Sequence, residues 1–358
     1  MVPRDTLVAI LDLARWAPSG DNTQPWRFEV RTDGTIAVHG FDTRDHVIYD
    51  FDGHASHIAH GALMETLRIA ASGFGCAIKW QLRAESPDGA PVYDIRVMPE
   101  ARLAPDPLLS FIESRVVQRR PMQTTPLSAV QRQALVASVG GDYELIMLES
   151  LSERARVARL LWDNAYIRLT CPEAFAVHSQ IIEWGVELSE DRIPEPAVGV
   201  DPMTAKLMRW VMQSWSRVDF FNRYLMGTIA PRVQLDLLPA LRCAAHVMLK
   251  ARRAPQTLLD YVSAGVAMQR LWLTVAAQGL HLQPEMTPVI FGWYVRAGRS
   301  ISTHPGIDQR AAQLTTKLSA LPGVGKADGL VFMGRIGQCA TPSSRSIRRP
   351  LESLLIQP

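Results

Sequence analysis

Apolar positions along the chain repeat with helical spacing in some stretches and alternate in others, a mixture that predicts both helices and strands. The first helical stretch ends before Pro18, which has no backbone donor. Asp33-Gly34 is a dipeptide typical of tight hairpins. The expected elements are, in order, a helix over 7–17, strands over 26–30 and 36–39, a helix over 56–72, and strands over 78–83 and 92–97.

A second, weaker copy of this order begins near Leu127, so the chain contains a degenerate internal repeat. Its expected elements are a helix over 127–138, a strand over 143–148, a long helix over 261–278 and a strand over 329–335. The two long helices carry Gly61 and Gly265 at comparable places, although a mid-helix glycine costs about 1 kcal/mol relative to alanine. We therefore expect these helices to approach closely, as helices do across the two-fold axis of a homodimer.

The stretch from 151 to 255 has no counterpart in the first copy and is rich in tryptophan and phenylalanine. Its pattern predicts helices over 152–167, 173–187 and 204–224. The expected organisation is a first half over 1–110, a second half over 111–150 and 256–358, and a helical insertion over 151–255. The insertion is either a packing subdomain or a lid, because long insertions beside sites often close over them.

The composition changes this picture little. Of 358 residues, 47% are hydrophobic and 20% charged, and the formal net charge of +3 argues against a dedicated nucleic-acid-binding protein. The four cysteines are scattered, so we expect reduced thiols and no metal site. The N-terminus has no signal-like stretch, and the most apolar helix is too short and too polar to cross a bilayer. These features predict a cytoplasmic protein without nucleic-acid or membrane partners.

The loop after the first helix offers the most specific chemistry. It holds short polar residues between Pro18 and Pro25, and a strand starts at Trp26. Ser19, Asn22 and Gln24 can present donors and acceptors to a planar polar ligand, as the edge of a flavin requires. The same residue types also make a well-capped turn, so the loop by itself leaves both interpretations open.

Two basic segments supply planar donor groups suited to phosphate and to flavin carbonyls. The first lies within 112–122 and the second within 342–352, and their arginines are Arg115, Arg119, Arg120, Arg345, Arg348 and Arg349. Taken alone, the first segment is also consistent with a solvent-exposed basic run, and the second with a basic C-terminal tail.

The order Ala-Pro-Ser-x-x-Asn-x-Gln-Pro-Trp-x-Phe over 17–28 closely resembles a loop of the nitroreductase family. In that family the Pro-Ser and Asn of this loop touch FMN bound at the dimer interface. The resemblance implies that Pro18, Ser19 and Asn22 contact FMN, while Gln24 and Trp26 hold the loop in place. It also implies an α+β protein with a nitroreductase-like three-layer α/β/α fold, here with internal duplication and a helical insertion.

The first basic segment matches the family only in part. Arg115 and Arg119 match the two outer arginines of its Arg-Arg-Ser/Thr-x-Arg segment. Val116 and Val117 replace an arginine and a hydroxyl residue, so phosphate binding is expected to be weaker or completed elsewhere.

Two later segments complete the implied site. The C-terminal Arg-Arg-Pro-Leu-Glu is similar to the family ending whose basic residues hold the FMN phosphate, which makes candidates of Arg345, Arg348 and Arg349, with Arg348 favoured. After the second long helix the family places a backbone N–H near flavin N5, the atom that accepts hydride. The residues at the matching place are Gln283, Pro284 and Glu285.

The first copy keeps the polar loop and the second keeps the arginines, so one complete FMN site is expected in a monomer that acts as a pseudo-dimer. The resemblance implies an NAD(P)H-dependent FMN oxidoreductase that passes hydride or electrons to a small acceptor, which the sequence does not identify. The flavin carries the reaction, so no catalytic side chain is expected. Two alternatives stay open: an FMN storage or sequestration protein, and a module that keeps the fold without flavin.

Overall fold

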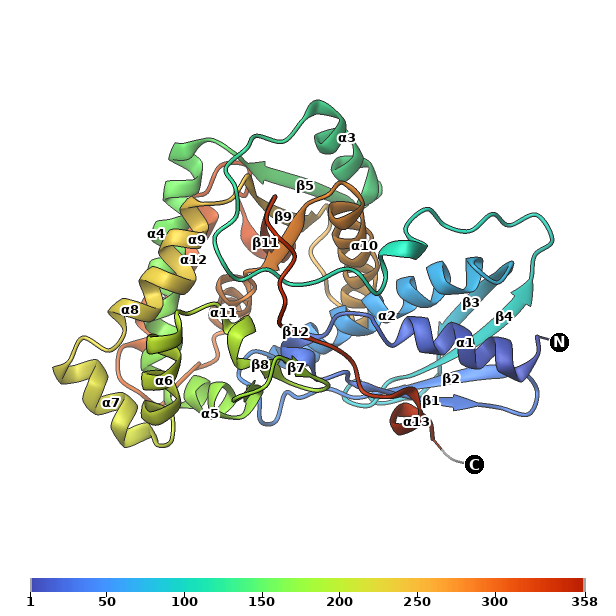
Figure 1. Ribbon diagram of the computed structural model, residues 1–358, viewed down its shortest axis with the longest axis horizontal. Helices are drawn as coiled ribbons and strands as arrows, with labels where there is room; N and C mark the ends of the chain where they lie inside the picture. Colours follow the sequence, from blue (N-terminus) through green and yellow to red (C-terminus); the bar gives the residue numbers. More distant parts are fainter. Residues whose placement is uncertain (1, 357–358) are drawn as a thin grey trace.

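The computed structural model describes residues 2–356 and contains two four-stranded antiparallel sheets (Figure 1). The first sheet has the order β1 (Trp26–Val30), β2 (Thr35–Gly40), β4 (Val92–Pro99), β3 (Cys76–Leu82). The second has the order β5 (Tyr143–Leu148), β9 (Ala245–Ala251), β11 (Leu330–Gly337), β10 (His281–Pro284).

The two sheets have the same topology, which confirms the internal duplication. In each, the strands lie in the order first, second, fourth, third, and a long helix joins the second strand to the third. These helices are α2 (His54–Ser72) and α10 (Leu258–Ala277), and each half also opens with a shorter helix, α1 (Arg4–Ala14) or α3 (Ala129–Ser138). The mixed α+β fold with internal duplication is therefore as predicted.

Helices α2 and α10 pack together at the centre of the molecule (Figure 1). A Cβ built on Gly61 would overlap the carbonyl oxygen of Val262, and one built on Gly265 would overlap that of Ile58. The two backbones are thus in direct contact, which only glycine permits at these positions. The close approach expected from the paired glycines is confirmed.

A helical segment joins β5 to β9, where the first half has only a tight hairpin. It contains α4 (Leu151–Thr170), α5 (Pro172–Ile181), α6 (Pro202–Val211), α7 (Trp215–Tyr224), α8 (Ile229–Pro231), a π-helical turn (Arg232–Leu237) and α9 (Leu238–Leu241), with short strands β6 (Ile182–Glu183), β7 (Leu188–Ser189) and β8 (Ile193–Pro194).

The expected end of this segment at residue 255 is wrong. Strand β9 pairs with both β5 and β11, so the second half resumes at Ala245. Residues 245–249 are all buried, and a strand covered on both faces lacks the alternation that marks a half-exposed strand. The segment is also no separable unit, because Leu160, Leu161 and Ile167 of α4 belong to the core of the second half.

Two of the predicted helices in the segment have different bounds in the structure. The helix expected over 204–224 is broken into α6 and α7, because the Ser214 side chain accepts a hydrogen bond from the N–H of Arg217 and starts a new helix. The helix expected over 173–187 ends at Ile181, where the chain enters β6.

The second half carries a further pair of helices that the sequence pattern did not indicate. Helices α11 (Thr287–Arg296) and α12 (Ile307–Ser319) lie between β10 and β11, where the first half has a short turn. Single turns of 3₁₀ helix complete the described elements: η1 (Gly20–Asn22), η2 (Phe51–Gly53), η3 (Leu109–Phe111), η4 (Glu195–Val198) and η6 (Ala327–Gly329). None of the helices described over residues 2–356 has the length and apolar character needed to cross a lipid bilayer.

The C-terminal tail returns to the first half of the molecule. It forms β12 (Arg345–Ser346) beside β7 and then α13 (Leu351–Leu354). Leu351 and Leu354 are buried in the core of the first half, and the N–H of Ile356 donates to Phe28 O over 2.8 Å. Residues 256–358 were expected to belong to the second half, but the last described part of this range packs on the first half.

Candidate functional site

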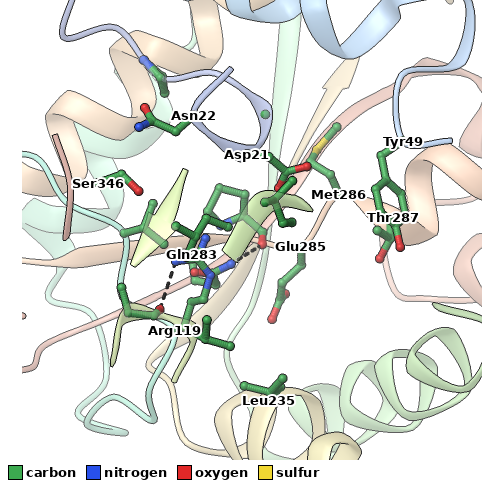
Figure 2. Close-up of a pocket in the computed structure, with 18 of the residues that line it drawn as sticks. Asp21, Asn22, Tyr49, Arg119, Leu235, Gln283, Glu285, Met286, Thr287 and Ser346 are labelled. Atoms are coloured by element: carbon green, nitrogen blue, oxygen red, sulfur yellow. Dashed lines mark hydrogen bonds between the residues drawn. The ribbon is translucent and has the colours of Figure 1, made fainter. Parts of the chain in front are cut away.

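A cavity of about 450 Å³ lies where the two halves meet the helical segment. This volume is in the range of small-molecule sites. Every sequence-predicted site residue except Arg349 lines it: Pro18, Ser19, Asn22, Arg115, Arg119, Gln283, Pro284, Glu285, Arg345 and Arg348. Figure 2 shows Asp21 and Glu285 near its middle, Tyr49 and Thr287 to one side, and Asn22 and Ser346 to the other.

The loop after α1 is held in a strained, well-anchored conformation. Asp21, Asn22 and Gln24 all have positive φ angles, 49°, 64° and 50°, which cost energy in residues other than glycine. The hydroxyl of Ser19 accepts from the N–H of Gln24 over 2.9 Å. The Asn22 amide nitrogen donates to Glu190 O and Ile347 O, over 3.0 and 3.1 Å. Asn22 thus ties the loop to the helical segment and the tail, in addition to lining the cavity.

One end of the cavity holds a cluster of arginines with no carboxylate partner. Arg115 and Arg348 are 5% and 8% exposed, and they donate to the backbone carbonyls of Trp16 and Ala17, each over 3.0 Å. Arg345 donates to Glu113 O over 2.7 Å. Within residues 2–356, none of the three forms an ion pair with an acidic side chain. Uncompensated cations this buried favour an anionic ligand.

The pKa shifts in this cluster have the same physical origin. Burial, reinforced by the charges of Arg348 and Arg345, lowers the pKa of Arg115 well below its ordinary value. Burial, with repulsion from Arg345 and Arg15, lowers the pKa of Arg348 to about 9. An anion bound here would reverse both effects, because it favours the charged form of each guanidinium.

Arg349 lies outside the cavity, unlike its neighbours in the tail. Its guanidinium pairs with the Asp191 carboxylate over 2.7 Å, and its N–H donates to the side-chain oxygen of Gln24 over 3.0 Å. Arg349 therefore fixes the tail against the polar loop, and Gln24 holds that loop as expected.

Three buried charged residues, Glu285, His246 and Arg335, form a triad at the wall near the middle of the cavity. Glu285 accepts from His246 Nδ1 over 2.8 Å and from Arg335 Nη1 over 3.0 Å. His246 Nε2 lies 3.0 Å from Ala240 O, which can only accept. Both ring nitrogens of His246 therefore donate, so the imidazole is positively charged. Arg335 and His246 were not among the predicted site residues, because only the sheet register brings them to Glu285.

We expect the free energy of unfolding to fall as the pH rises from 6.5 towards 10. Burial opposes the charge on His246, but attraction to Glu285 outweighs it and raises the pKa to about 10 from 6.5. A pKa raised on folding stabilises the protein fully below 6.5, and that contribution is lost as the pH passes through the folded-state value. Its size is on the order of a few kcal/mol.

Urea unfolding across this pH range measures the effect. His246→Gln should flatten the alkaline slope, whereas His304→Gln, at a partly exposed histidine outside the cavity, should leave it unchanged. Equal slopes in the two variants would show that His246 is not charged in the folded protein.

The segment matched to the flavin N5 region uses backbone N–H groups within the sheet. Pro284 has no N–H, and the N–H of Glu285 donates to Met333 O over 2.8 Å. Because antiparallel strands exchange bonds at every second residue, the N–H of Gln283 is directed towards Arg335. The Glu285 N–H is therefore engaged within the sheet, while Gln283, Pro284 and Glu285 all line the cavity and their contact with a cofactor stays a prediction. Met286 and Thr287, which start α11 at the cavity wall, have no intrahelical acceptor for their N–H groups.

The other end of the cavity combines apolar walls with neutral polar pairs. The Tyr49 hydroxyl is hydrogen-bonded to His178 Nε2 over 2.9 Å. Burial and the Arg168 charge lower the pKa of His178 to about 3, so its imidazole is neutral. Arg168 is paired with Asp236 over 2.7 Å. The apolar walls come mainly from the helical segment, with Ile181, Met208, Met212 and Leu235. No sequence pattern marked these residues as neighbours.

Asp21 is a further cavity residue outside the predicted set. Burial raises the pKa of its carboxyl, while the charge of Arg119 acts in the opposite direction. Burial lowers the pKa of Arg119 to about 10, and Asp21 partly opposes that shift. Arg119 also donates to Ala197 O over 3.1 Å, so it joins the cavity to the helical segment.

A curated relative of the whole chain is the uncharacterized protein MT1398 of Mycobacterium tuberculosis (strain CDC 1551 / Oshkosh), with 24% identity over 365 residues. The alignment covers 97% of this chain but 48% of the relative, so the chain spans about half the length of that protein.

Solved structures superpose on part of the chain. The nitroreductase NfnB of Mycobacterium smegmatis in complex with NADPH gives a TM-score of 0.36 at 15% identity, covering 68% of this chain and 94% of that one. An FMN-bound nitroreductase of Bacteroides fragilis NCTC 9343 gives 0.33 at 12% identity, covering 66% and 89%. Residues 1–38, which include the polar loop on the cavity wall, match the model of the nitroreductase family. This match confirms the resemblance of the chain to the nitroreductase family.

Proposed function

We propose that this protein is an FMN-dependent oxidoreductase of the nitroreductase type, which takes hydride from NADH or NADPH and passes hydride or electrons to a small acceptor. The observation that carries the proposal is the cluster of Arg115, Arg345 and Arg348 at one end of the cavity, which has no carboxylate partner among residues 2–356. Burying cations without a partner is costly, so an arrangement of this kind favours a ligand with a phosphate.

The residues present fit FMN along the length of the cavity. Arg115, Arg345 and Arg348 would hold its phosphate, and the polar loop with Ser19 would lie along the adjoining part of the ligand. The N–H groups of Met286 and Thr287, which have no intrahelical acceptor at the start of α11, would supply donors at the far side. Bound FMN would supply the hydride chemistry, accepting from a nicotinamide nucleotide and donating to the acceptor.

The chain's own side chains then bind, orient and exclude water. Arg335 and the charged His246 place positive charge behind Glu285, which keeps that carboxylate ionised at the cavity wall. Tyr49 holds a proton at its hydroxyl oxygen, hydrogen-bonded to neutral His178. The apolar side chains of the helical segment limit the water that reaches this end of the cavity.

The alternative of FMN storage draws support from the same helical wall. Met208 and Met212 of the α6 region and Ile181 of α5 line the cavity, and a ligand covered by them would be shielded from a second substrate. Reduction of the bound flavin separates the two functions, because storage requires binding alone.

The test is the visible spectrum of the full chain, followed by anaerobic addition of NADH or NADPH. We expect a yellow protein, or a colourless one that binds added FMN and then shows flavin absorbance. We further expect at least one nucleotide to bleach that absorbance. Binding without bleaching by either nucleotide would favour storage. A chain that does not bind FMN would exclude both functions.

A further inference from the structure

The helical segment carries an unusual concentration of exposed apolar side chains. Nine of the sixteen exposed large apolar residues in the described chain lie between 203 and 238. The most prominent are on or just after α6 and α7, and we call them the α6–α7 face: Met203, Leu207, Trp210, Phe220, Tyr224 and Met226. Met203, Tyr224 and Met226 are 81%, 70% and 66% exposed. Exposed apolar patches on this scale mark interaction sites.

Helix α6 is apolar on two sides, and only one of them is covered. Its inward residue Met208 lines the cavity, and Ala205 is buried in a small local core. Met203, Leu207 and Trp210 are spaced by four and three residues, so they share the opposite side and face solvent. Packing within the described chain thus accounts for the apolar residues on the inner side of α6, whereas those on its outer side remain exposed to solvent.

The apolar surface continues from α6 onto α7. Trp210 lies edge-on to Phe221 with ring centroids 5.8 Å apart, and Phe220 contacts Tyr224 at 5.2 Å. The two helices lie at the end of the molecule opposite both termini (Figure 1). The α6–α7 face is therefore one connected surface at an extremity, where a partner can reach it without meeting the rest of the chain.

Positive charge surrounds this face. Between residues 202 and 231 the cations are Lys206, Arg209, Arg217 and Arg223, and the single acidic residue is Asp219. Asp219 pairs with Arg223 over 2.8 Å. Within the described chain, Lys206 and Arg209 have no acidic partner, and both are exposed. The guanidinium of Arg217 lies 4.6 Å from the ring centre of Trp210, so cation and indole are presented together.

We propose that the α6–α7 face docks on the surface of an anionic lipid membrane, contrary to the expectation from the sequence of no membrane partner. Helices that lie in a membrane interface combine aromatic and aliphatic side chains on one side with lysine and arginine beside them, as α6 and α7 do. A second copy of the chain fits less well, because a two-fold contact through this face would bring two positively charged surfaces together. The docking surface rests on these residues and not on FMN.

The position of α6 links this surface to the cavity. One side of α6 faces solvent, and Met208 on its other side lines the cavity. When the protein is docked, only this helix would therefore separate the bilayer from the cavity. If the proposed oxidoreductase function holds, a membrane-dissolved acceptor would have a short path to the site.

Sedimentation with lipid vesicles tests the proposal on the full chain. We expect binding to vesicles of phosphatidylcholine mixed with phosphatidylglycerol, little binding to phosphatidylcholine alone, and weakening by added salt. The double variant Trp210→Ser with Phe220→Ser should weaken vesicle binding at least tenfold. Lys206→Gln with Arg209→Gln should abolish the preference for anionic vesicles.

The matched control is Val130→Ser with Leu151→Ser, two side chains that are 71% and 66% exposed on other helices. It should bind vesicles as the parent chain does. Thermal unfolding of each variant, and its FMN content, show that the fold and the cavity are intact, so loss of docking is distinguishable from loss of the proposed function. Failure to bind anionic vesicles at low salt would overturn the proposal. So would a dimer in solution that Trp210→Ser with Phe220→Ser converts to monomer, since a second copy would then cover the face.

Discussion

Replacing Gly265 with alanine is expected to destabilise the protein by about 3 kcal/mol, a large share of the stability of a typical chain. The new methyl group would overlap the carbonyl oxygen of Ile58 on the neighbouring helix, and Gly61 Cα would be 2.9 Å away. Both obstacles are backbone atoms, so no side-chain rotation relieves them. Urea or thermal unfolding measures the loss.

The direction of this effect is informative, because helix propensity by itself predicts the opposite sign. Gly→Ala inside a helix normally stabilises by about 1 kcal/mol. The control is Gly292→Ala in α11, where a new Cβ would lie 3.2 Å from the movable end of the Arg296 side chain and at ordinary contact distance from the Thr315 side chain. This variant should be neutral or stabilising. Similar stability changes in the two variants would show that α2 and α10 are not in backbone contact.

Arg115→Met is expected to weaken FMN binding about 10- to 100-fold, the loss that follows from one charge-assisted hydrogen bond to phosphate. The same change should leave the FMN-free protein as stable as before, or more so. Arg115 is 5% exposed and has no acidic partner in the described part of the chain. Methionine can pack against Trp272, whose ring centre lies 4.5 Å from the guanidinium. Opposite effects on ligand affinity and on apoprotein stability are what a binding residue, rather than a structural one, should produce.

Flavin fluorescence titration and thermal unfolding without FMN give the two readouts. Arg349→Met is the matched control, because Arg349 follows Arg348 in the tail but lies outside the cavity and pairs with Asp191. Its FMN affinity should change by less than about twofold, since a surface ion pair contributes little. A loss of affinity as large as that of Arg115→Met would place the phosphate elsewhere.

The features predictable from the sequence are those that depend on local pattern. The polar loop has a distinctive order of residues, and its Pro18, Ser19 and Asn22 line the cavity. The glycines of the two long helices indicated their contact, because a residue that costs helix stability needs a packing reason. The arginines were identifiable because few structural roles require several guanidinium groups so close together in sequence.

The features that escaped prediction depend on register and on contacts between distant segments. Strand β9 is buried on both faces and has no alternation to mark it. The Glu285 N–H donates to Met333 O because the register of β10 against β11 places these two residues opposite each other. No local sequence pattern contains this register. Tyr49 and His178 are 129 residues apart and meet only because α5 folds over the first half.

The return of the tail to the first half has a consequence for how the cavity behaves at low concentration. The loop before β1, the arginines at 115 and 119, and the tail with Arg348 all belong to one covalent chain. A pocket shared between two subunits comes apart when the subunits are diluted, because its assembly is bimolecular. Here assembly is unimolecular, so the ligand-binding capacity per chain should stay constant however dilute the protein becomes.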